Sequence, residues 1–223
     1  MTIKAILFDL DGTLLDTLED IADAFNHIRD RYGLVPMPVD TFRTVVGDGA
    51  RVAVQRAMPE QARDEAALDK LVEQFRHYYA VNWKHKTAPY DGITDLLHEL
   101  AQSSAALAVC SNKPHATVVQ CVDYFFGSNR FDRILGHSDQ FPRKPDPAST
   151  LSILASLGCR ASECLFVGDM NVDVQTARAA GIRSVGAGWG FRGSDELRSG
   201  GADYCIEHPS DLLHLLRELN SSV

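Results

Sequence analysis

Six short apolar runs recur along the chain, and helical patterns lie between most of them. The runs span residues 3–8, 105–110, 133–136, 164–167, 183–187 and 204–206. Each run has the length of a strand, and the segments between them carry apolar residues three or four positions apart, on one helical face. Strands that alternate with helices are typical of a mainly parallel, doubly wound sheet. The alternation therefore predicts an α/β fold with a Rossmann-like sheet.

The segment 16–86 interrupts this alternation because it contains four helical patterns and no convincing strand. The first pattern places its apolar residues along one stripe and has Thr17 at its start, where the hydroxyl could cap the helix. Residues 88–93 contain proline and glycine and form the predicted return hinge. We therefore predict a core made of residues 1–15 and 87–223, with a small α-helical cap inserted as residues 16–86.

Composition limits the classes of partner and compartment. The 223 residues are 45% hydrophobic and 23% charged, which is close to the average of globular domains. A formal charge of -8 without a concentrated basic face argues against nucleic acid as a partner. The chain has five cysteines and no CxxC pair, which predicts reduced thiols. No apolar stretch near the amino terminus suits a signal peptide or a membrane span, so we expect a cytoplasmic monomer or small homo-oligomer.

Polar side chains collect where the predicted strands end. They are Asp9 and Asp11 after the first run, Ser111 and Asn112 after the second, Lys144 in the loop region after the third, and Asp169 and Asp173 after the fourth. Ligands of open parallel sheets bind in the crevice beyond the carboxyl ends of the strands. Because four separate segments deliver these side chains to one edge, we expect them to form one site.

Three aspartates at that edge, Asp9, Asp11 and Asp169, would repel one another without a cation. A hard divalent ion such as Mg2+ prefers oxygen ligands, and it could also neutralise a substrate phosphate. Asp173 lies one helical turn after Asp169, which fits either direct ligation or a supporting or capping role. The sequence therefore predicts a Mg2+ site that lets an acidic protein bind a phosphorylated small molecule.

The Asp9 and Asp11 pair also suits phosphoryl transfer. An ionised Asp9 could attack phosphorus, while Asp11 gives a proton to the leaving alkoxide and later takes one from water. Lys144 would add positive charge and Ser111 a hydrogen bond to a phosphoryl oxygen.

Four ordered motifs carry a family resemblance: "DLDGTLLDT" at 9–17, "SNK" at 111–113, "KPDP" at 144–147 and "GDMNVD" at 168–173. They resemble the motifs of the haloacid dehalogenase-like phosphatases. The resemblance implies roles for the following residues: Asp9 as nucleophile, Asp11 as general acid and base, Ser111 and Lys144 as stabilisers of the phosphoryl group, Gly12 and Asn112 as further substrate contacts, and Asp9, Asp169 and the backbone carbonyl of Asp11 as Mg2+ ligands.

Segment 16–86 resembles the mobile caps that this family places after its first motif. Residues 45–57 and 185–191, together with "SNKP" at 111–114, look most like the bacterial phosphoglycolate phosphatase branch, which implies 2-phosphoglycolate as substrate. Arg51, after the glycines of "GDGAR", is the candidate contact for the substrate carboxylate, with a solvated helix-start arginine as the alternative. Trp189 and Phe191 are expected to be packing residues near the site.

Three other functions compete with this interpretation. A sugar phosphomutase or a pyrophosphatase would share the family's motifs. A phosphate-accepting signalling module would also phosphorylate an aspartate on a doubly wound sheet, but such modules are shorter, lack a helical insertion and need no proton donor two residues after the nucleophile. The sequence thus favours hydrolysis of a small phosphomonoester.

Overall fold

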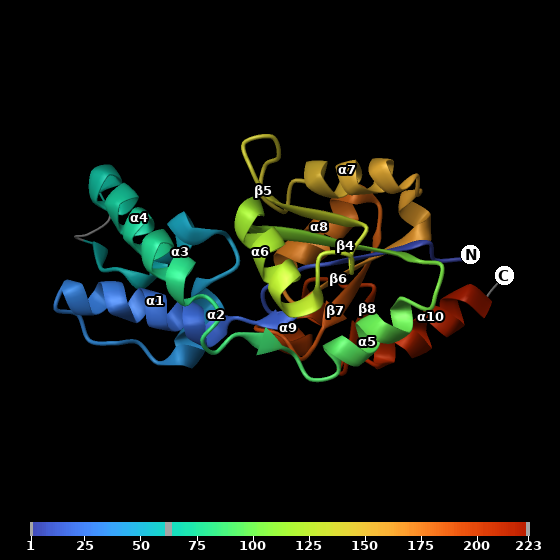
Figure 1. Cartoon of the computed structure of the whole chain (residues 1–223), viewed down its shortest axis with the longest axis horizontal. Coiled ribbons are helices and arrows are strands. Elements are labelled where there is room, and N and C mark those ends of the chain that lie inside the picture. Colours follow the sequence, from blue (N-terminus) through green and yellow to red (C-terminus); the bar gives the residue numbers. More distant parts are fainter. Residues whose placement is uncertain (1, 61–63, 222–223) are drawn as a thin grey trace. The chain divides into compact units, whose positions relative to one another are not determined.

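The computed structural model describes residues 2–60 and 64–221, and the chain divides into two compact units (Figure 1). One unit comprises residues 1–15 and 89–223, and the other comprises residues 16–88. The sequence places the first boundary at the same residue and the second after residue 86 rather than 88. Among the described residues, no helix combines the length and the apolar character needed to cross a bilayer.

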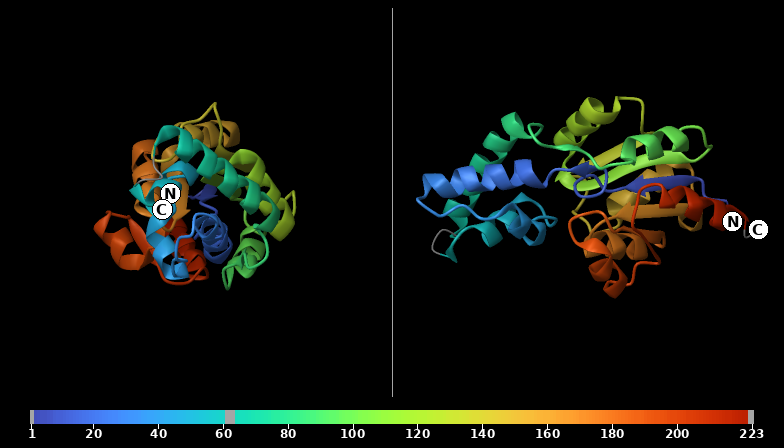
Figure 2. Two further views of the ribbon diagram at one scale, coloured as in Figure 1. Left: turned by 90° about the vertical axis from the view of Figure 1, so that its left-hand side faces the viewer. Right: turned by 90° about the horizontal axis from the view of Figure 1, so that it is seen from below.

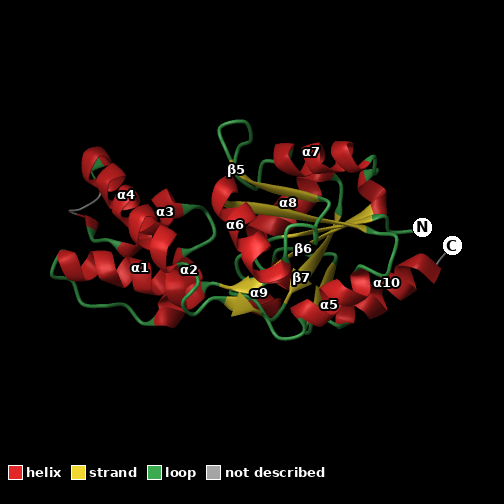
Figure 3. Cartoon of the chain, viewed as in Figure 1, coloured by secondary structure: helices red, strands yellow, loops and turns green. Residues whose placement is uncertain are grey.

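The first unit is built on a parallel sheet, drawn in yellow in Figure 3. Within the described residues its strand order is β5 (Arg133–His137), β4 (Ala106–Pro114), β1 (Ala5–Phe8), β6 (Cys164–Gly168), β7 (Arg183–Ala187) and β8 (Tyr204–Ile206). All neighbouring pairs are parallel. Each of the six predicted runs is a strand, and the largest difference is in β4, which continues through Pro114.

Helices cover both faces of this sheet. They are α5 (Ile93–Leu100), α6 (His115–Phe126), α7 (Ala148–Leu157), α8 (Asn171–Ala180), α9 (Gly193–Ser199) and α10 (Asp211–Ser221). On one face Leu7 and Phe166 pack with Leu154 of α7 and Ala177 of α8. Helices α5 and α10 lie on the opposite side (Figures 1 and 2). Burial on both faces explains why the central strands β1 and β6 are continuously apolar rather than alternating.

Strand β1 is the point at which the chain changes direction across the sheet. Ala5 of β1 pairs with Ala106 of β4 on one side and with Cys164 of β6 on the other. The chain first adds strands beyond β4 and later returns to add β6, β7 and β8 on the other side. A crevice opens outside the carboxyl ends of strands at such a reversal. The residues that follow β1, β4 and β6 are therefore the ones that can share a ligand.

The second unit is helical, as predicted. It contains α1 (Leu18–Arg31), a short 3-10 turn (Val39–Thr41), α2 (Phe42–Val45), α3 (Ala50–Ala57) and α4 (Glu65–Asn82). Its core is aromatic: the ring of Phe25 stacks on Phe75 with centroids 4.4 Å apart and on Phe42 at 5.5 Å. These stacked rings bring α1, α2 and α4 together, and their burial stabilises the helical unit.

Two features of this region differ from the sequence-based expectation. A two-stranded sheet of β2 (Leu15–Asp16) and β3 (Ala88–Pro89) connects the two segments, and strands of this length leave no periodicity to detect. The capping role of Thr17 is also wrong. Its hydroxyl is buried without a hydrogen-bond partner, and the Leu18 N–H instead donates to Asp16 Oδ1 at 3.2 Å.

Asp20 ties the beginning of α1 to the end of the helical unit. Its buried carboxylate accepts hydrogen bonds from the Lys86 N–H at 3.1 Å, from the Thr87 N–H at 2.9 Å and from the Thr87 hydroxyl at 2.7 Å. The two chain segments that enter and leave the unit are thereby held together next to the β2–β3 connection.

We expect Asp20→Ala to lower the free energy of unfolding by about 1.5 to 3 kcal/mol, because a charged acceptor is lost and buried donors are left unsatisfied. Asp23 is a matched control on the same helix, since its partly exposed carboxylate forms an ion pair with Lys86 Nζ at 2.9 Å. Asp23→Ala should cost about 0 to 1 kcal/mol. Urea unfolding of both variants measures the difference, and equal losses would contradict the role of Asp20.

Candidate active site at the carboxyl end of the sheet

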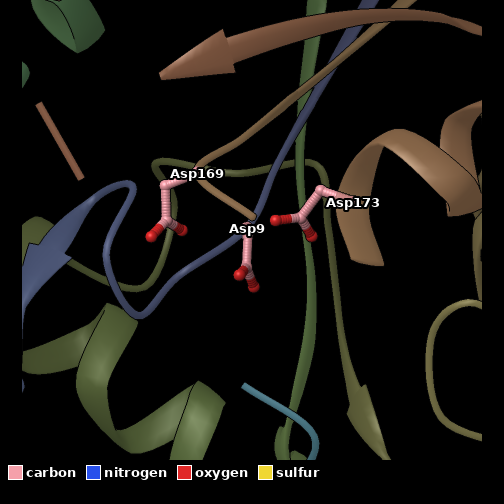
Figure 4. A group of neighbouring side chains, drawn as sticks. All are labelled: Asp9, Asp169 and Asp173. Atoms are coloured by element: carbon pink, nitrogen blue, oxygen red, sulfur yellow. The ribbon is translucent and has the colours of Figure 1, made fainter. Parts of the chain in front are cut away.

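The predicted site residues converge at the edge where β1, β4 and β6 end. Asp9 follows β1, Asp169 follows β6, and Asp173 lies in the first turn of α8. Figure 4 shows the three carboxylates, with that of Asp173 directed toward Asp9, and each offers an oxygen to a group whose members lie within 4.8 Å of one another. All three residues are buried, with exposed fractions of 6%, 0% and 2%. Three carboxylates so placed form a strongly negative centre.

Lys144 provides the positive charge at this centre. Its Nζ lies 2.7 Å from Asp173 Oδ1 and 2.8 Å from Asp9 Oδ1, and it donates to the carbonyl oxygen of Cys110 at 3.1 Å. Burial by itself would lower the pKa of Lys144, but the carboxylates of Asp173 and Asp9 outweigh burial and raise the pKa above its usual value. Lys144 is therefore a fixed ammonium that neutralises only part of the negative charge.

Burial, together with the negative charge that Lys144 leaves unbalanced, raises the pKa values of the Asp9 and Asp169 carboxyls. Burial raises the pKa of Asp9 to about 7, with Lys144 opposing the rise and Asp173 adding to it. Burial also raises the pKa of Asp169 well above its usual value, with further contributions from Asp173 and Asp9. The ionised forms of both carboxyls need more positive charge nearby than Lys144 supplies, and a divalent cation would provide it.

The donor set fits a hard divalent cation. Among the described residues, the Asp9 carboxylate has one ion pair, between Oδ1 and the Lys144 ammonium at 2.8 Å. Both oxygens of Asp173, in contrast, already accept hydrogen bonds, Oδ1 from Lys144 and Oδ2 from the Met170 N–H at 3.1 Å. Asp169 differs from Asp173 because its hydrogen-bond donors among the described residues, the Phe191 N–H and the Thr13 hydroxyl, are neutral and leave its charge unbalanced. Asp9 and Asp169 are therefore the better candidates for oxygen ligands of Mg2+, while Asp173 holds Lys144 and caps α8.

Asp11 and Gly12 occupy the turn that follows Asp9. Gly12 has φ +87°, and a Cβ there would lie 2.3 Å from Asp169 Oδ2, so only glycine allows the close approach of this turn to Asp169. The Gly12 N–H donates to the Leu15 carbonyl at 2.8 Å and closes the turn. Gly12 was predicted as a substrate contact, and the structure assigns its amide to this turn.

Lys113 is a charged residue of the site that the sequence interpretation missed. Its Nζ lies 2.7 Å from Asp11 Oδ1, and its side chain is 6% exposed while that of Asp11 is 22% exposed. A charge-assisted hydrogen bond of this length fixes the position of the Asp11 carboxyl. The signal was present, since Lys113 is the last residue of "SNK", but a lysine in a loop has no pattern that distinguishes it from a surface lysine.

Ser111 and Asn112 lie at the end of β4, both buried, as the predicted site requires. The amide of Asn112 brackets the backbone of Lys144: the Lys144 N–H donates to Asn112 Oδ1 at 2.7 Å, and Asn112 Nδ2 donates to the Lys144 carbonyl at 3.3 Å. Asn112 was predicted to contact substrate. In the structure its amide positions Lys144, and the predicted contact with substrate stays a prediction.

Arg51 belongs to the helical unit, at the start of α3. Its guanidinium forms ion pairs with Glu65 and Asp69 of the same unit, and its side chain is 38% exposed. To bind a substrate carboxylate, Arg51 would have to leave these two partners. The predicted contact between Arg51 and substrate stays a prediction.

Comparisons with known proteins agree with this arrangement. Residues 6–187 match the family model described as haloacid dehalogenase-like hydrolase. The phosphoglycolate phosphatase of Mesorhizobium japonicum is 35% identical over 193 residues, which are 86% of this chain and 85% of that protein. The phosphoglycolate phosphatase of Aquifex aeolicus is 33% identical over 213 residues, with 96% of each chain covered.

A solved structure from Lactobacillus delbrueckii subsp. bulgaricus has a similar fold throughout. It aligns with a TM-score of 0.91 and 32% identity, over 97% of this chain and 99% of that one.

Proposed function

The chain belongs to the haloacid dehalogenase-like hydrolases and is a phosphoric monoester hydrolase, and from this premise we propose that it is a Mg2+-dependent enzyme acting on 2-phosphoglycolate through an aspartyl-phosphate. The observation that carries the proposal is the buried Asp9 carboxylate, which lies beside Asp169 and forms an ion pair with Lys144. A carboxylate in this state is available both as a nucleophile and as a ligand of a cation.

In the first chemical step an oxygen of Asp9 attacks phosphorus, and the bond between phosphorus and the ester oxygen breaks. Asp11 transfers its proton to the departing alkoxide, so an alcohol leaves while the phosphoryl group stays on Asp9. In the second step Asp11 takes a proton from water, the water oxygen attacks phosphorus, and the bond to Asp9 breaks. Free phosphate and the original carboxylate of Asp9 result.

Positioning and charge neutralisation supply most of the rate in phosphoryl transfer. A bound Mg2+, held by Asp9, Asp169 and the backbone carbonyl of Asp11, would neutralise charge on the phosphoryl oxygens. Lys144 adds a second positive charge beside Asp9, and the hydroxyl of Ser111, in the last four residues of β4, would donate to a phosphoryl oxygen. Lys113 holds Asp11 at the leaving-group side of the nucleophile.

The proposed substrate rests on relatives. Those from Mesorhizobium japonicum and Aquifex aeolicus are named phosphoglycolate phosphatases, and the chain covers at least 85% of each. We therefore propose 2-phosphoglycolate over larger phosphomonoesters, with the helical unit, including Arg51, as the part that selects it.

A panel of phosphomonoesters tests the proposal. Phosphate release from 2-phosphoglycolate, two sugar phosphates, pyrophosphate and nitrophenyl phosphate is measured with Mg2+ and after exhaustive chelation. We expect the highest kcat/KM with 2-phosphoglycolate and no turnover without the metal. Preference for pyrophosphate would indicate a pyrophosphatase, and transfer of the phosphoryl group between sugar positions without net phosphate release would indicate a phosphomutase. Full activity after chelation would refute the metal requirement.

The two hydrogen bonds between the Asn112 amide and the Lys144 backbone lead to a second test. Asn112→Ala removes two hydrogen bonds, each worth about 0.5 to 1.5 kcal/mol, so we expect kcat/KM to fall by about 5- to 150-fold. If Asn112 acts only through Lys144, the same substitution in a Lys144→Ala background should have no further effect.

Asn26 offers a matched control, because its amide brackets the backbone of Met37 in the same way, at 2.8 and 2.9 Å. Asn26→Ala should lower stability and leave kcat with nitrophenyl phosphate unchanged. Additive losses for Asn112→Ala and Lys144→Ala would contradict the positioning role of Asn112.

A further inference from the structure

The loop between β7 and α9 reaches the candidate metal site through a backbone amide. The Phe191 N–H donates to Asp169 Oδ2 at 2.9 Å, while the Thr13 hydroxyl donates to Asp169 Oδ1 at 3.1 Å. Each oxygen of the Asp169 carboxylate thus accepts one hydrogen bond, from a different loop. Two such donors fix the rotation of the carboxylate, whose oxygens belong to the same group as those of Asp9 and Asp173.

Gly190 makes this approach sterically possible. A Cβ at Gly190 would lie 2.2 Å from Asp169 Cβ and 2.4 Å from the carbonyl oxygen of Gly12, and both distances are far below contact. Gly190 is not among the glycines with positive φ, so its backbone conformation would accept alanine and only the lack of space excludes it. The loop therefore packs directly against the Asp169 side chain.

Trp189 anchors the same loop to the turn after β1. Its indole N–H donates to the Thr13 carbonyl at 3.0 Å, and Thr13 is also the residue whose hydroxyl holds Asp169. Trp189 was expected to be a packing residue, yet it is only partly buried and has a directed hydrogen bond. Three successive residues, 189–191, thus meet Thr13, Gly12 and Asp169.

We propose that residues 189–191 are a positioning loop that sets the Asp169 carboxylate in the orientation required by a divalent cation, with Trp189 as the residue that anchors the loop. Groups that hydrogen-bond a metal ligand orient it, and their removal commonly weakens metal binding by about 10- to 100-fold. The inference rests on the proposed function, because it presumes that the cation binds at Asp9 and Asp169.

Trp189→Phe and Trp83→Phe form a matched pair, since these are the two tryptophans of the chain and Trp83 lies at the end of α4 in the helical unit. Mg2+ binding is measured by calorimetry without substrate, on the whole protein. Trp189→Phe loses one hydrogen bond, worth about 0.5 to 1.5 kcal/mol. Its Mg2+ binding should therefore be about 2- to 13-fold weaker than that of the wild type. Trp83→Phe should bind Mg2+ like the wild type.

Gly190→Ala is the stronger variant, because the added methyl group must displace Asp169. We expect its Mg2+ affinity to fall by at least about 10-fold. Urea unfolding of the metal-free proteins separates positioning from a merely structural role, since a structural role would lower stability and leave the Mg2+ affinity of the folded protein unchanged.

The outcomes distinguish the inference from the proposed function. If the wild type binds Mg2+ and folded Trp189→Phe binds it equally well, the positioning loop is refuted and the proposed function stands. If the wild type itself binds no Mg2+, the metal-dependent function fails and takes the inference with it. Weaker binding by Trp189→Phe and Gly190→Ala, together with unchanged binding by Trp83→Phe, supports both.

Discussion

Asp9→Asn is expected to lower turnover by about four orders of magnitude or more, the scale on which enzymes respond to removal of a nucleophile that acts together with its partners. The amide has the shape of the carboxylate, but it neither attacks phosphorus effectively nor offers an anionic ligand. Phosphate release from 2-phosphoglycolate at saturating Mg2+ measures the loss. Asp91→Asn, at an exposed aspartate of the same unit, is the control and should keep full activity.

The fold should survive the Asp9→Asn substitution. Burial raises the pKa of Asp9 from 3.8 to about 7, so in the metal-free protein its ionised form is disfavoured relative to the unfolded chain. The favourable contribution of the protonated Asp9 carboxyl to folding stability is therefore fully present below about pH 4, and it is lost as the pH rises toward 7. Unfolding of metal-free Asp9→Asn should show a smaller decline over that pH range. A folded variant with substantial Mg2+-dependent activity would remove Asp9 from the nucleophile role.

Asp11→Asn should fail in a different way, because the nucleophile remains while both proton transfers are lost. General acid and base catalysis contributes about 10²- to 10⁴-fold, so turnover of an alkyl phosphate such as 2-phosphoglycolate should fall by that amount or more. Nitrophenolate leaves without a proton, so nitrophenyl phosphate should still phosphorylate the variant. Because water then lacks its base, covalent phosphate should accumulate on Asp9.

Rapid acid quench followed by mass measurement of the protein detects that intermediate in Asp11→Asn. Equal defects with the alkyl and nitrophenyl substrates, combined with no covalent phosphate, would show that Asp11 is neither the acid nor the base. The Asp9→Asn variant serves as the negative control, since it has no carboxylate to phosphorylate.

Much of the fold followed from the sequence because parallel strands carry a strong local signal. The central strands β1 and β6 are buried at every position and apolar throughout, and each of the six predicted runs is a strand of the sheet. The short strands β2 and β3 were missed because two residues have no period. The capping role of Thr17 was wrong because its backbone, with φ -104° and ψ 2°, is not in the extended conformation of a capping residue.

The clustering of Asp9, Lys144 and Asp169 was also determined by the sequence. Once the strands are parallel, their carboxyl ends meet at one edge, so residues that follow different strands must converge there whatever the details of packing. The proximity of Lys144 to Asp9, and of Asp9, Asp169 and Asp173 to one another, agrees with this rule.

Only the tertiary structure decided which partner each polar group has. Asn112 brackets a lysine backbone 32 residues away, and Lys113 reaches Asp11 across 102 residues. The amide that orients Asp169 is a main-chain N–H of Phe191, which any non-proline residue would offer, so no residue type could reveal it. Local sequence specifies which strands and helices form, whereas contacts made by backbone groups and by long flexible side chains depend on where the completed fold places them.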